Sequence, residues 1–250
     1  MKTTTRSLFA AAALTASAMY PAADAEVPTG TPTFTNPLDI DNAYFPFEVG
    51  AMKMYRGKSD GERISFVDDY GSETRTFAWN STTVETRLLR EVEFEEGELV
   101  EISYNWFAQA DDGTVYYFGE TVDDYEDGEI VAHEGSWLVG GPTLPSDPAE
   151  TANAPDPAVF MPGNPEPGDQ WKPEDLFPLV DETVTFEKVV GKEKVEAGKY
   201  TDVMRVKETS DIDPGFERKW YARGVGVIRT KGKGEKVECI ASSFLETEED

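Results

Sequence analysis

The chain has 250 residues, a formal net charge of −26 at pH 7 and a single cysteine. With one cysteine an internal disulfide is impossible, so the fold must be stabilised by an apolar core, which 39% hydrophobic residues can supply. So acidic a surface repels phosphate groups, which makes nucleic acid and anionic membrane surfaces poor partners. Cations and basic partners suit it better, but an acidic coat that only keeps the protein soluble is the simpler explanation.

The first 25 residues have the order of regions that is typical of a secretory signal peptide. Lys2 and Arg6 precede an apolar run over residues 8–16, and the small residues Ala23-Asp24-Ala25 follow. The run is too short to span a bilayer, which takes roughly 20 apolar residues. We predict cleavage after Ala25 and a periplasmic or extracellular protein with no integral membrane segment. A lipid anchor would need a cysteine after the cleavage point, and the single cysteine is Cys239, so we predict no lipidation.

The rest of the chain is expected to be one domain and a monomer. Residues 26–39 are rich in Thr, Pro and Gly and predict an extended N-terminal arm, and residues 40–250 suit a single β domain. Eight prolines lie between residues 140 and 168. Because proline cannot donate a ladder hydrogen bond, this segment is expected to be a loop outside the sheet, either a functional cover or a disordered stretch. Only Pro173–Phe177 suggests a short helical turn.

Alternating hydrophobic residues and glycine-bearing turns predict a mostly β fold with little helix. Strands are expected over residues 84–94, 99–109, 114–121, 129–138, 183–190, 200–208, 216–222, 226–231 and 236–245. Asp112-Gly113 and Asp127-Gly128 are favoured hairpin turns, so the strands should form an antiparallel meander, either a strongly curved sheet or an open barrel. On strand 99–109 the alternation predicts one buried face and one wet face. The buried face is expected to hold Val100, Ile102, Tyr104, Trp106 and Ala108, and the wet face Glu101, Ser103 and Asn105.

Most catalytic templates are missing from the residue inventory. His133 is the only histidine and there is no Gly-x-Ser-x-Gly motif, which disfavours a serine hydrolase. One His and one Cys cannot close a zinc site, and Cys239, on an apolar alternating segment, is expected to be a buried, inert thiol. Paired carboxylates could hydrolyse glycosidic bonds, but acidic residues are too numerous to single out a pair. The inventory therefore favours a protein that is not an enzyme, with no cofactor.

One segment partly matches a calcium-binding loop. Counted as an EF-hand, residues 123–134 place Asp123, Asp127 and Glu134 at ligand positions one, five and twelve. Tyr125 occupies position three, where a ligand oxygen belongs, and the flanks have strand patterns where an EF-hand needs helices. The expected structure is a hairpin with an acidic tip that binds Ca²⁺ weakly at most.

Aromatic side chains on the predicted strands are the other candidates for a binding surface. The candidate ligand-binding residues are Trp106, Tyr116, Phe118, Trp137, Phe160 and Trp220. Aromatic rings can stack on sugars or line an apolar cleft, although alternating aromatics on strands are more often core residues. Within the proline-rich segment we expect residues 142–157 to be exposed and Phe160 to dock against the aromatic face.

Several motifs resemble those of an uncharacterised family of exported bacterial proteins. They are Asp41-Asn42-Ala43-Tyr44-Phe45-Pro46, Trp106-Phe107-Ala108-Gln109, Asp112-Gly113-Thr114-Val115-Tyr116-Tyr117-Phe118-Gly119-Glu120, Gly135-Ser136-Trp137 and Trp220-Tyr221-Ala222-Arg223-Gly224-Val225-Gly226-Val227. The last of these is also similar to the closing strands of periplasmic carriers with a strongly curved half-barrel. That second resemblance implies a concave apolar face for an acyl chain or a partner's segment, although a fold alone does not license a function.

These observations favour a non-catalytic binding or carrier protein that uses an aromatic-lined face of its sheet. Its partner would be an apolar small molecule, a lipid or another protein. The two alternatives are a secreted hydrolase that acts through carboxylates, on glycans for example, and a surface protein that binds Ca²⁺ weakly.

Overall fold

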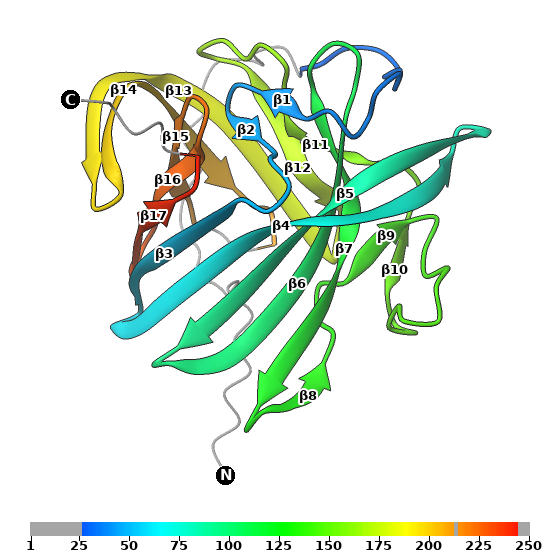
Figure 1. Cartoon of the computed structure of the whole chain (residues 1–250), viewed down its shortest axis with the longest axis horizontal. Helices are drawn as coiled ribbons and strands as arrows, with labels where there is room; N and C mark the ends of the chain where they lie inside the picture. Colours follow the sequence, from blue (N-terminus) through cyan, green and yellow to red (C-terminus); the bar gives the residue numbers. More distant parts are fainter. Residues whose placement is uncertain (1–26, 213–214, 245–250) are drawn as a thin grey trace.

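The computed structural model describes residues 27–212 and 215–244. In this part of the chain every regular element is a β-strand, and a long antiparallel sheet curves into a nearly closed barrel with one seam (Figure 1). This confirms the expected fold class. The strands are β1 (Asp41–Asn42), β2 (Phe45–Pro46), β3 (Met52–Ser59), β4 (Glu62–Trp79), β5 (Thr82–Glu95), β6 (Glu98–Gln109), β7 (Val115–Glu126), β8 (Glu129–Ala132), β9 (Trp137–Val139), β10 (Ala152–Ala154), β11 (Ala158–Met161), β12 (Gln170–Leu176), β13 (Val180–Val195), β14 (Gly198–Thr209), β15 (Glu217–Ala222), β16 (Gly226–Lys231) and β17 (Glu235–Ser242).

Two meanders, joined by one long-range pairing, build the sheet. Strands β3 to β7 pair in chain order, as do β12 to β17, and β17 pairs with β3 to join the two halves. The seam lies where β12 approaches β11, a short strand that pairs with β7. Across it the indole Nε1 of Trp171 donates a hydrogen bond to the carbonyl oxygen of Phe160 at 3.1 Å. The sheet therefore encloses an interior although its two ends do not form a ladder.

Local sequence signals placed most strands correctly. Glycines at the hairpin turns, among them Gly97 and Gly128, have positive φ angles of 92° and 82°, which a glycine adopts without steric cost. The expected strand at 129–138 is divided into β8 and β9 by the turn at Gly135. The helical turn expected at Pro173–Phe177 is wrong, because residues 170–176 form β12. A bulge between Trp171 and Glu174 accommodates Pro173, which has no N–H to donate.

The proline-rich segment also differs from the expectation that it stays outside the sheet. Ala152–Ala154 forms β10, parallel to β9, and Ala158–Met161 forms β11, antiparallel to β7. Both strands are short enough to lie between prolines, so their residues keep the donors that a ladder requires. The expectation that residues 142–157 are exposed is only partly right, because Pro142 to Ser146 are exposed but Thr151 and Ala154 are buried. Phe160 packs against the rings of Phe45 and Phe107, as expected.

A buried ion pair fastens this segment to β4. The guanidinium of Arg75 donates to both carboxylate oxygens of Asp147 at 2.8 Å, and the Asp147 side chain is only 3% exposed. The same carboxylate accepts hydrogen bonds from the backbone N–H groups of Thr143 and Leu144. Asp147 therefore holds one turn of the segment against the outside of the barrel.

Replacing Asp147 with alanine is expected to lower the free energy of unfolding by about 2–4 kcal/mol. The change leaves a buried guanidinium without its partner, and hydrogen bonds to charged groups contribute about 1.5–3 kcal/mol. Urea unfolding followed by tryptophan fluorescence measures the effect. Glu150→Ala, an exposed acid on the same segment, serves as the control and should change stability by less than about 0.5 kcal/mol. Equal losses in the two variants would contradict a fastening role for Asp147.

One end of the barrel is closed by the aromatic motif at residues 41–47, which forms β1, β2 and the turn between them. The Phe45 ring packs 4.8 Å from that of Phe107, and the Phe47 ring 4.9 Å from that of Tyr70. Asn42 fixes the motif, because its amide donates to the carbonyls of Gly113 and Pro162. This plug and the hairpin tips of β3–β4, β5–β6 and β7–β8 lie at opposite ends of the molecule in Figure 1.

Two apolar clusters lie on opposite faces of the sheet. The larger one fills the plugged end of the interior and includes Cys239, which is fully buried as expected. The smaller one lies outside, around Phe77 and Phe118, where Phe34 of the N-terminal arm covers it. None of the described residues forms a helix that could cross a membrane.

Candidate functional site

The register of the sheet shows that acidic residues share the inward face. Starting from Tyr55 and Tyr70, whose side chains belong to the interior cluster, the pairing can be followed strand by strand round the barrel. The acidic pairs that lie directly opposite one another on this face are Asp68–Glu91, Glu93–Glu101, Glu101–Asp124, Glu174–Glu182 and Glu208–Glu217. Like charges in such cross-strand positions repel one another, so the sheet pays for this arrangement in stability.

Over residues 101–105 of β6 the two faces are the reverse of those predicted, whereas Ala108 is buried as expected, in the outer cluster. Ser103 and Asn105, expected on the wet face, are buried on the inward face, whereas Ile102 and Tyr104 are half-buried on the outward face. Alternation separates the two faces of a strand but does not say which one is enclosed. A wide barrel can hold polar side chains and solvent inside, so the polar face of β6 became the inner one.

Most of the inward carboxylates are only half-buried. Glu91, Glu101, Glu120, Glu174, Glu182 and Glu217 each keep intermediate exposure although they face the interior. Their side chains therefore border solvent inside the barrel wall. They lie toward the hairpin tips, on the far side of the interior from the aromatic plug. The interior consequently has an apolar, filled half and an acidic, hydrated half.

Burial and mutual repulsion raise the pKa values of these carboxyls. Burial, followed by the charge of Glu101, raises the pKa of Glu93 to about 8. Burial and the charge of Asp124 raise the pKa of Glu101 to about 7. Glu120 and Glu174 both have pKa values raised to about 8, first by burial and then by the charges of Glu101 and Glu120 respectively. Because β7 and β12 lie on the two sides of the seam, the acidic surface continues across it.

We call the connected carboxylates that run round the inner wall the acidic strip. It consists of Glu93, Glu101, Glu120, Glu174, Glu182 and Glu208. Its one described ion-pair partner is Lys219, whose ammonium lies 2.7 Å from Glu208 Oε2 and 3.4 Å from Glu217 Oε1. The remaining members have no ion-pair partner among the described residues.

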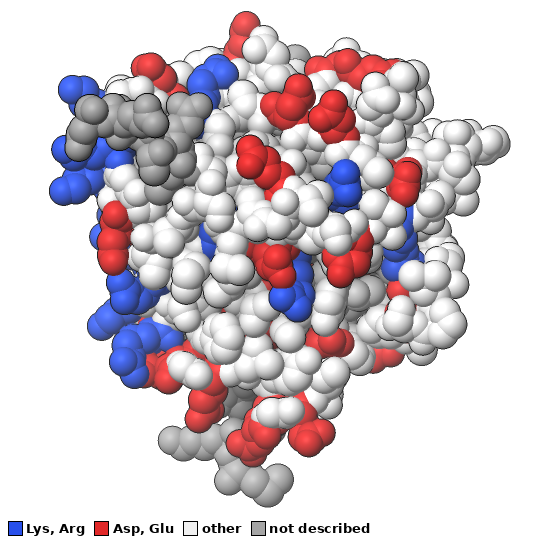
Figure 2. Space-filling view, viewed as in Figure 1, with Lys and Arg blue, Asp and Glu red and all other residues white. Residues whose placement is uncertain are grey.

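Most arginines of β4, β5 and β14–β16 pair with acids on the outer face instead, whereas Arg87 of β5 donates to the carbonyl oxygen of Leu38. Examples of these pairs are Arg90 with Asp69 at 2.6 Å, and Arg218 with Glu187 at 2.9 Å. Figure 2 shows the outer surface with both signs of charge, and with Lys and Arg gathered on the left, where Figure 1 places β3, β13 and β14. Ionisable groups of both signs are thus mixed outside the barrel, whereas those on the hydrated half of its inner face are almost all carboxyls.

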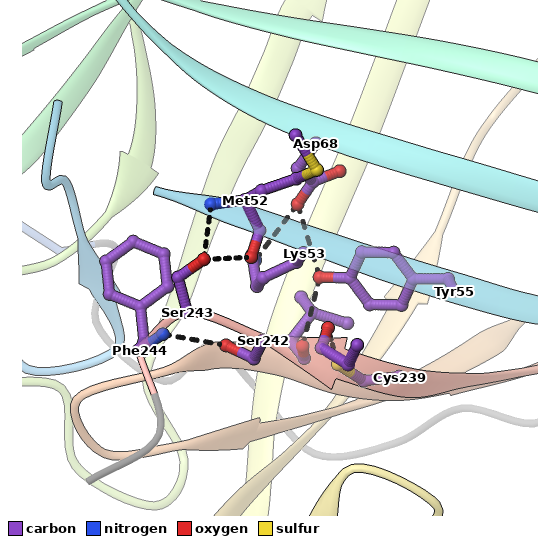
Figure 3. Close-up of polar contacts among 10 residues, drawn as sticks. Met52, Lys53, Tyr55, Asp68, Cys239, Ser242, Ser243 and Phe244 are labelled. Carbon is purple, nitrogen blue, oxygen red and sulfur yellow. Dashed lines mark hydrogen bonds and ion pairs between the residues drawn. The ribbon is translucent and has the colours of Figure 1, made fainter. Parts of the chain in front are cut away.

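A second polar group lies deeper, where the acidic strip meets the aromatic half (Figure 3). The Lys53 ammonium is 3.0 Å from Asp68 Oδ2, and both side chains are buried. The Tyr55 hydroxyl lies 3.2 Å from the same carboxylate oxygen, and the ammonium lies over the rings of Tyr55 and Tyr70. Burial alone would lower the pKa of Lys53, but Tyr55, Tyr70 and Asp68 together raise it well above its ordinary value. This cluster therefore keeps one permanent cation in the interior.

The other carboxylate oxygen of Asp68 has no hydrogen-bond partner among the described groups. Glu91, which lies opposite Asp68 across β4 and β5, has a pKa raised well above its ordinary value by burial and by Asp68. A protonated Glu91 can donate a hydrogen bond to Asp68, which an ionised one cannot. The cluster thus connects the buried lysine to the acidic strip.

The six aromatic candidates do not form one site. Trp137 and Phe160 belong to the interior cluster, whereas Tyr116, Phe118 and Trp106 belong to the outer one. Trp220 also belongs to the interior cluster, and it lies opposite Arg229 across β15 and β16, with the guanidinium 5.8 Å from its ring. Of the outer residues, Tyr116 lines a shallow surface depression together with Trp79 and the N-terminal arm.

The candidate calcium segment is a β-hairpin of β7 and β8. Asp123 Oδ1 lies 3.0 Å from His133 Nδ1, Asp127 occupies the exposed turn, and the backbone N–H of Glu134 donates to Asp124. The three candidate ligands do not converge. Across the described ranges, no three His, Cys, Asp or Glu side chains are grouped so as to hold a metal ion.

Sequence reasoning overlooked the acidic strip because acids are abundant everywhere in this chain. A signal was nonetheless present. Glu91, Glu93 and Glu95 recur at every second position of one predicted strand, and Glu101 follows on the next strand with the parity that places it opposite. Such a recurrence at period two predicts an acidic face rather than a scattered acidic coat.

Fold and inner surface together define an all-β, barrel-like protein with a carboxylate-lined interior. No protein family model matches the chain, so the family resemblance expected from its motifs is not confirmed. The comparison with curated proteins finds no match either. Among solved structures, the chain is similar to a "putative lipoprotein" from Parabacteroides distasonis ATCC 8503, with 13% sequence identity and a TM-score of 0.35, over 81% of this chain and 99% of that one.

Proposed function

We propose that this protein is an exported, non-catalytic binding or carrier protein that takes a small ligand into the open half of its barrel. The observation that supports the proposal most directly is the partial exposure of inward carboxylates such as Glu101 and Glu182. Their partial exposure means that these carboxylates are accessible to solvent although they lie on the inward face. Barrels of more than about eight strands commonly enclose such space and use it for ligands.

The two halves of the interior suit different parts of a ligand. The aromatic half contains the ring of Tyr117, which makes T-shaped contacts with the rings of Trp137 at 5.1 Å and Phe160 at 5.8 Å. The hydrated half offers carboxylates, which disfavour anionic head groups. The predicted signal peptide lies outside the described residues, so export is part of this proposal.

Native mass spectrometry of protein purified from its host tests the proposal. The expected result is a species heavier than the polypeptide that releases a small molecule on denaturation. Glu101→Trp, which places an indole in the hydrated half, should abolish this species, whereas Tyr104→Trp on the outward face of the same strand should retain it. A ligand that both variants retain equally would contradict an interior site, and a wild-type protein without any ligand would contradict the carrier role.

A specific observation also keeps a carboxylate hydrolase as a second candidate. Glu93 and Glu101 lie opposite one another with pKa values raised to about 8 and about 7. At neutral pH such a pair shares one proton, which is the arrangement that general acid and base catalysis of glycoside hydrolysis requires. Hydrolysis of a glycan panel that Glu101→Gln abolishes would favour this candidate over the carrier.

A further inference from the structure

We infer that the ligand of the barrel is a linear polyamine, an organic cation whose ammonium groups are spaced along a flexible chain. This inference rests on the proposed binding function and names the chemistry of its ligand. The acidic strip would hold the chain by pairing successive ammonium groups with carboxylates of neighbouring strands.

Carboxylates of the acidic strip oppose one another across neighbouring strands. Glu93 and Glu101 face each other from β5 and β6, and Glu174 and Glu182 from β12 and β13. None of the four lies within ion-pair distance of a cation in the part of the chain that the structure describes, and only Glu174 and Glu182 lie within range of the charge of Lys219. A sheet gains nothing from opposing unpaired acids, because each pair is destabilising when both members are ionised. A cation placed between them would remove that repulsion.

Two carboxylates on the inward face, those of Asp68 and Glu93, are almost completely buried. Asp68 is 4% exposed; its Oδ2 atom is paired with Lys53 and Tyr55, whereas its Oδ1 atom has no hydrogen-bond partner among the described groups. Glu93 is 6% exposed on the inward face, and no described group donates a hydrogen bond to it or forms an ion pair with it. A buried carboxylate oxygen that lacks a donor is destabilising when the group is ionised. Such groups are expected where a bound donor completes the site.

The spacing of the carboxylates favours an extended amine over a metal ion. Ca²⁺ needs six to eight oxygens that converge on one point, and no such convergence exists among the described acids. The strip instead offers single carboxylates from successive strands, which are about 4.8 Å apart in a sheet. Ammonium groups that are separated by three or four methylenes can meet such a row one at a time, and the methylenes can lie against the aromatic half.

Calorimetric titration of the purified protein with spermine, at about pH 7.5 and low salt, tests this inference. We expect saturable binding that Glu93→Gln/Glu101→Gln/Glu182→Gln weakens at least about tenfold. The matched control is Glu48→Gln/Glu129→Gln/Glu150→Gln, which removes the same charge from exposed positions. Its affinity should stay within about threefold of wild type, because screened surface charges contribute little. Circular dichroism of each variant verifies that it is folded.

Three results would overturn the polyamine assignment. One is equal weakening in both triple variants, which would reflect net charge alone. Another is Ca²⁺ binding as tight as that of spermine and abolished by the inward variant, which would indicate a metal site. The third is no spermine binding by a protein whose native mass spectrum contains a neutral or anionic ligand. In that last case the carrier function stands and only the ligand class fails.

Discussion

The free energy of unfolding is expected to fall by about 3–5 kcal/mol as the pH rises from about 5 to about 8. Glu93, Glu120 and Glu174 have pKa values raised to about 8, mainly by burial. Between the ordinary glutamate pKa and these values, the folded state binds more protons than the unfolded one, so stability decreases as the pH increases. One unit of pKa shift corresponds to about 1.4 kcal/mol per group, and solvent at the half-buried groups reduces the total.

Acids with lowered pKa values act in the opposite direction at lower pH. Hydrogen bonds and ion pairs hold the pKa values of Asp147 and Glu187 below their ordinary range, and this stabilisation is lost as the pH falls below about 4. Stability should therefore be greatest near pH 5. Chemical denaturation at a series of pH values measures the curve, and Glu93→Gln should flatten its descending limb. A stability that stays level or increases between pH 5 and pH 8 would show that the inward acids are ordinarily solvated.

Replacing Lys53 with methionine is expected to lower the free energy of unfolding by about 3–5 kcal/mol. The ammonium is the ion-pair partner of Asp68 at 3.0 Å, and its removal leaves a buried carboxylate beside Glu91. Breaking a buried pair by removing one member costs about this much, whereas replacing both members with apolar residues is often nearly neutral. The double variant Lys53→Met/Asp68→Leu should therefore regain most of the loss.

Arg56→Met provides the control on the same strand. Arg56 pairs with Glu196 at 3.0 Å, but both side chains are about 60% exposed, and exposed pairs contribute at most about 1 kcal/mol. Guanidinium chloride unfolding of the four proteins forms the comparison. A double variant that is less stable than Lys53→Met would mean that Lys53 stabilises the barrel through its packing on Tyr55 and Tyr70, independently of Asp68.

The fold could be predicted from the sequence because its signals are local. Asp-Gly turns and period-two alternation identified most strands of both meanders. The closure of the sheet could not be predicted in the same way, because it depends on the pairing of β17 with β3 and on a seam between segments far apart in the chain. The bulge that accommodates Pro173 in β12 is likewise a tertiary feature, since local propensity favours a turn there.

The candidate site was harder to predict than the fold. The candidate aromatics of β7, Tyr116 and Phe118, belong to the outer cluster, whereas Tyr117 between them belongs to the inner one. Only the register shows which acids oppose one another, and only closure shows that they face an enclosed space. A sequence with 49 acidic residues contains many pairs, and geometry alone selects Glu93 and Glu101 from them.

On this proposal, unpaired carboxylates on the inner wall of the barrel form a binding site for organic cations. Carbon-detected NMR titration of the glutamate carboxyls, with and without saturating spermine, tests it most directly. We expect the pKa of Glu93, raised to about 8 in the unliganded barrel, to fall by at least about one unit when spermine is bound, because a nearby cation favours the ionised form. The pKa of Glu96, lowered by its hydrogen bond with Arg63 at an exposed turn, should not change. A Glu93 carboxyl that titrates near the ordinary glutamate value and ignores spermine would contradict the account.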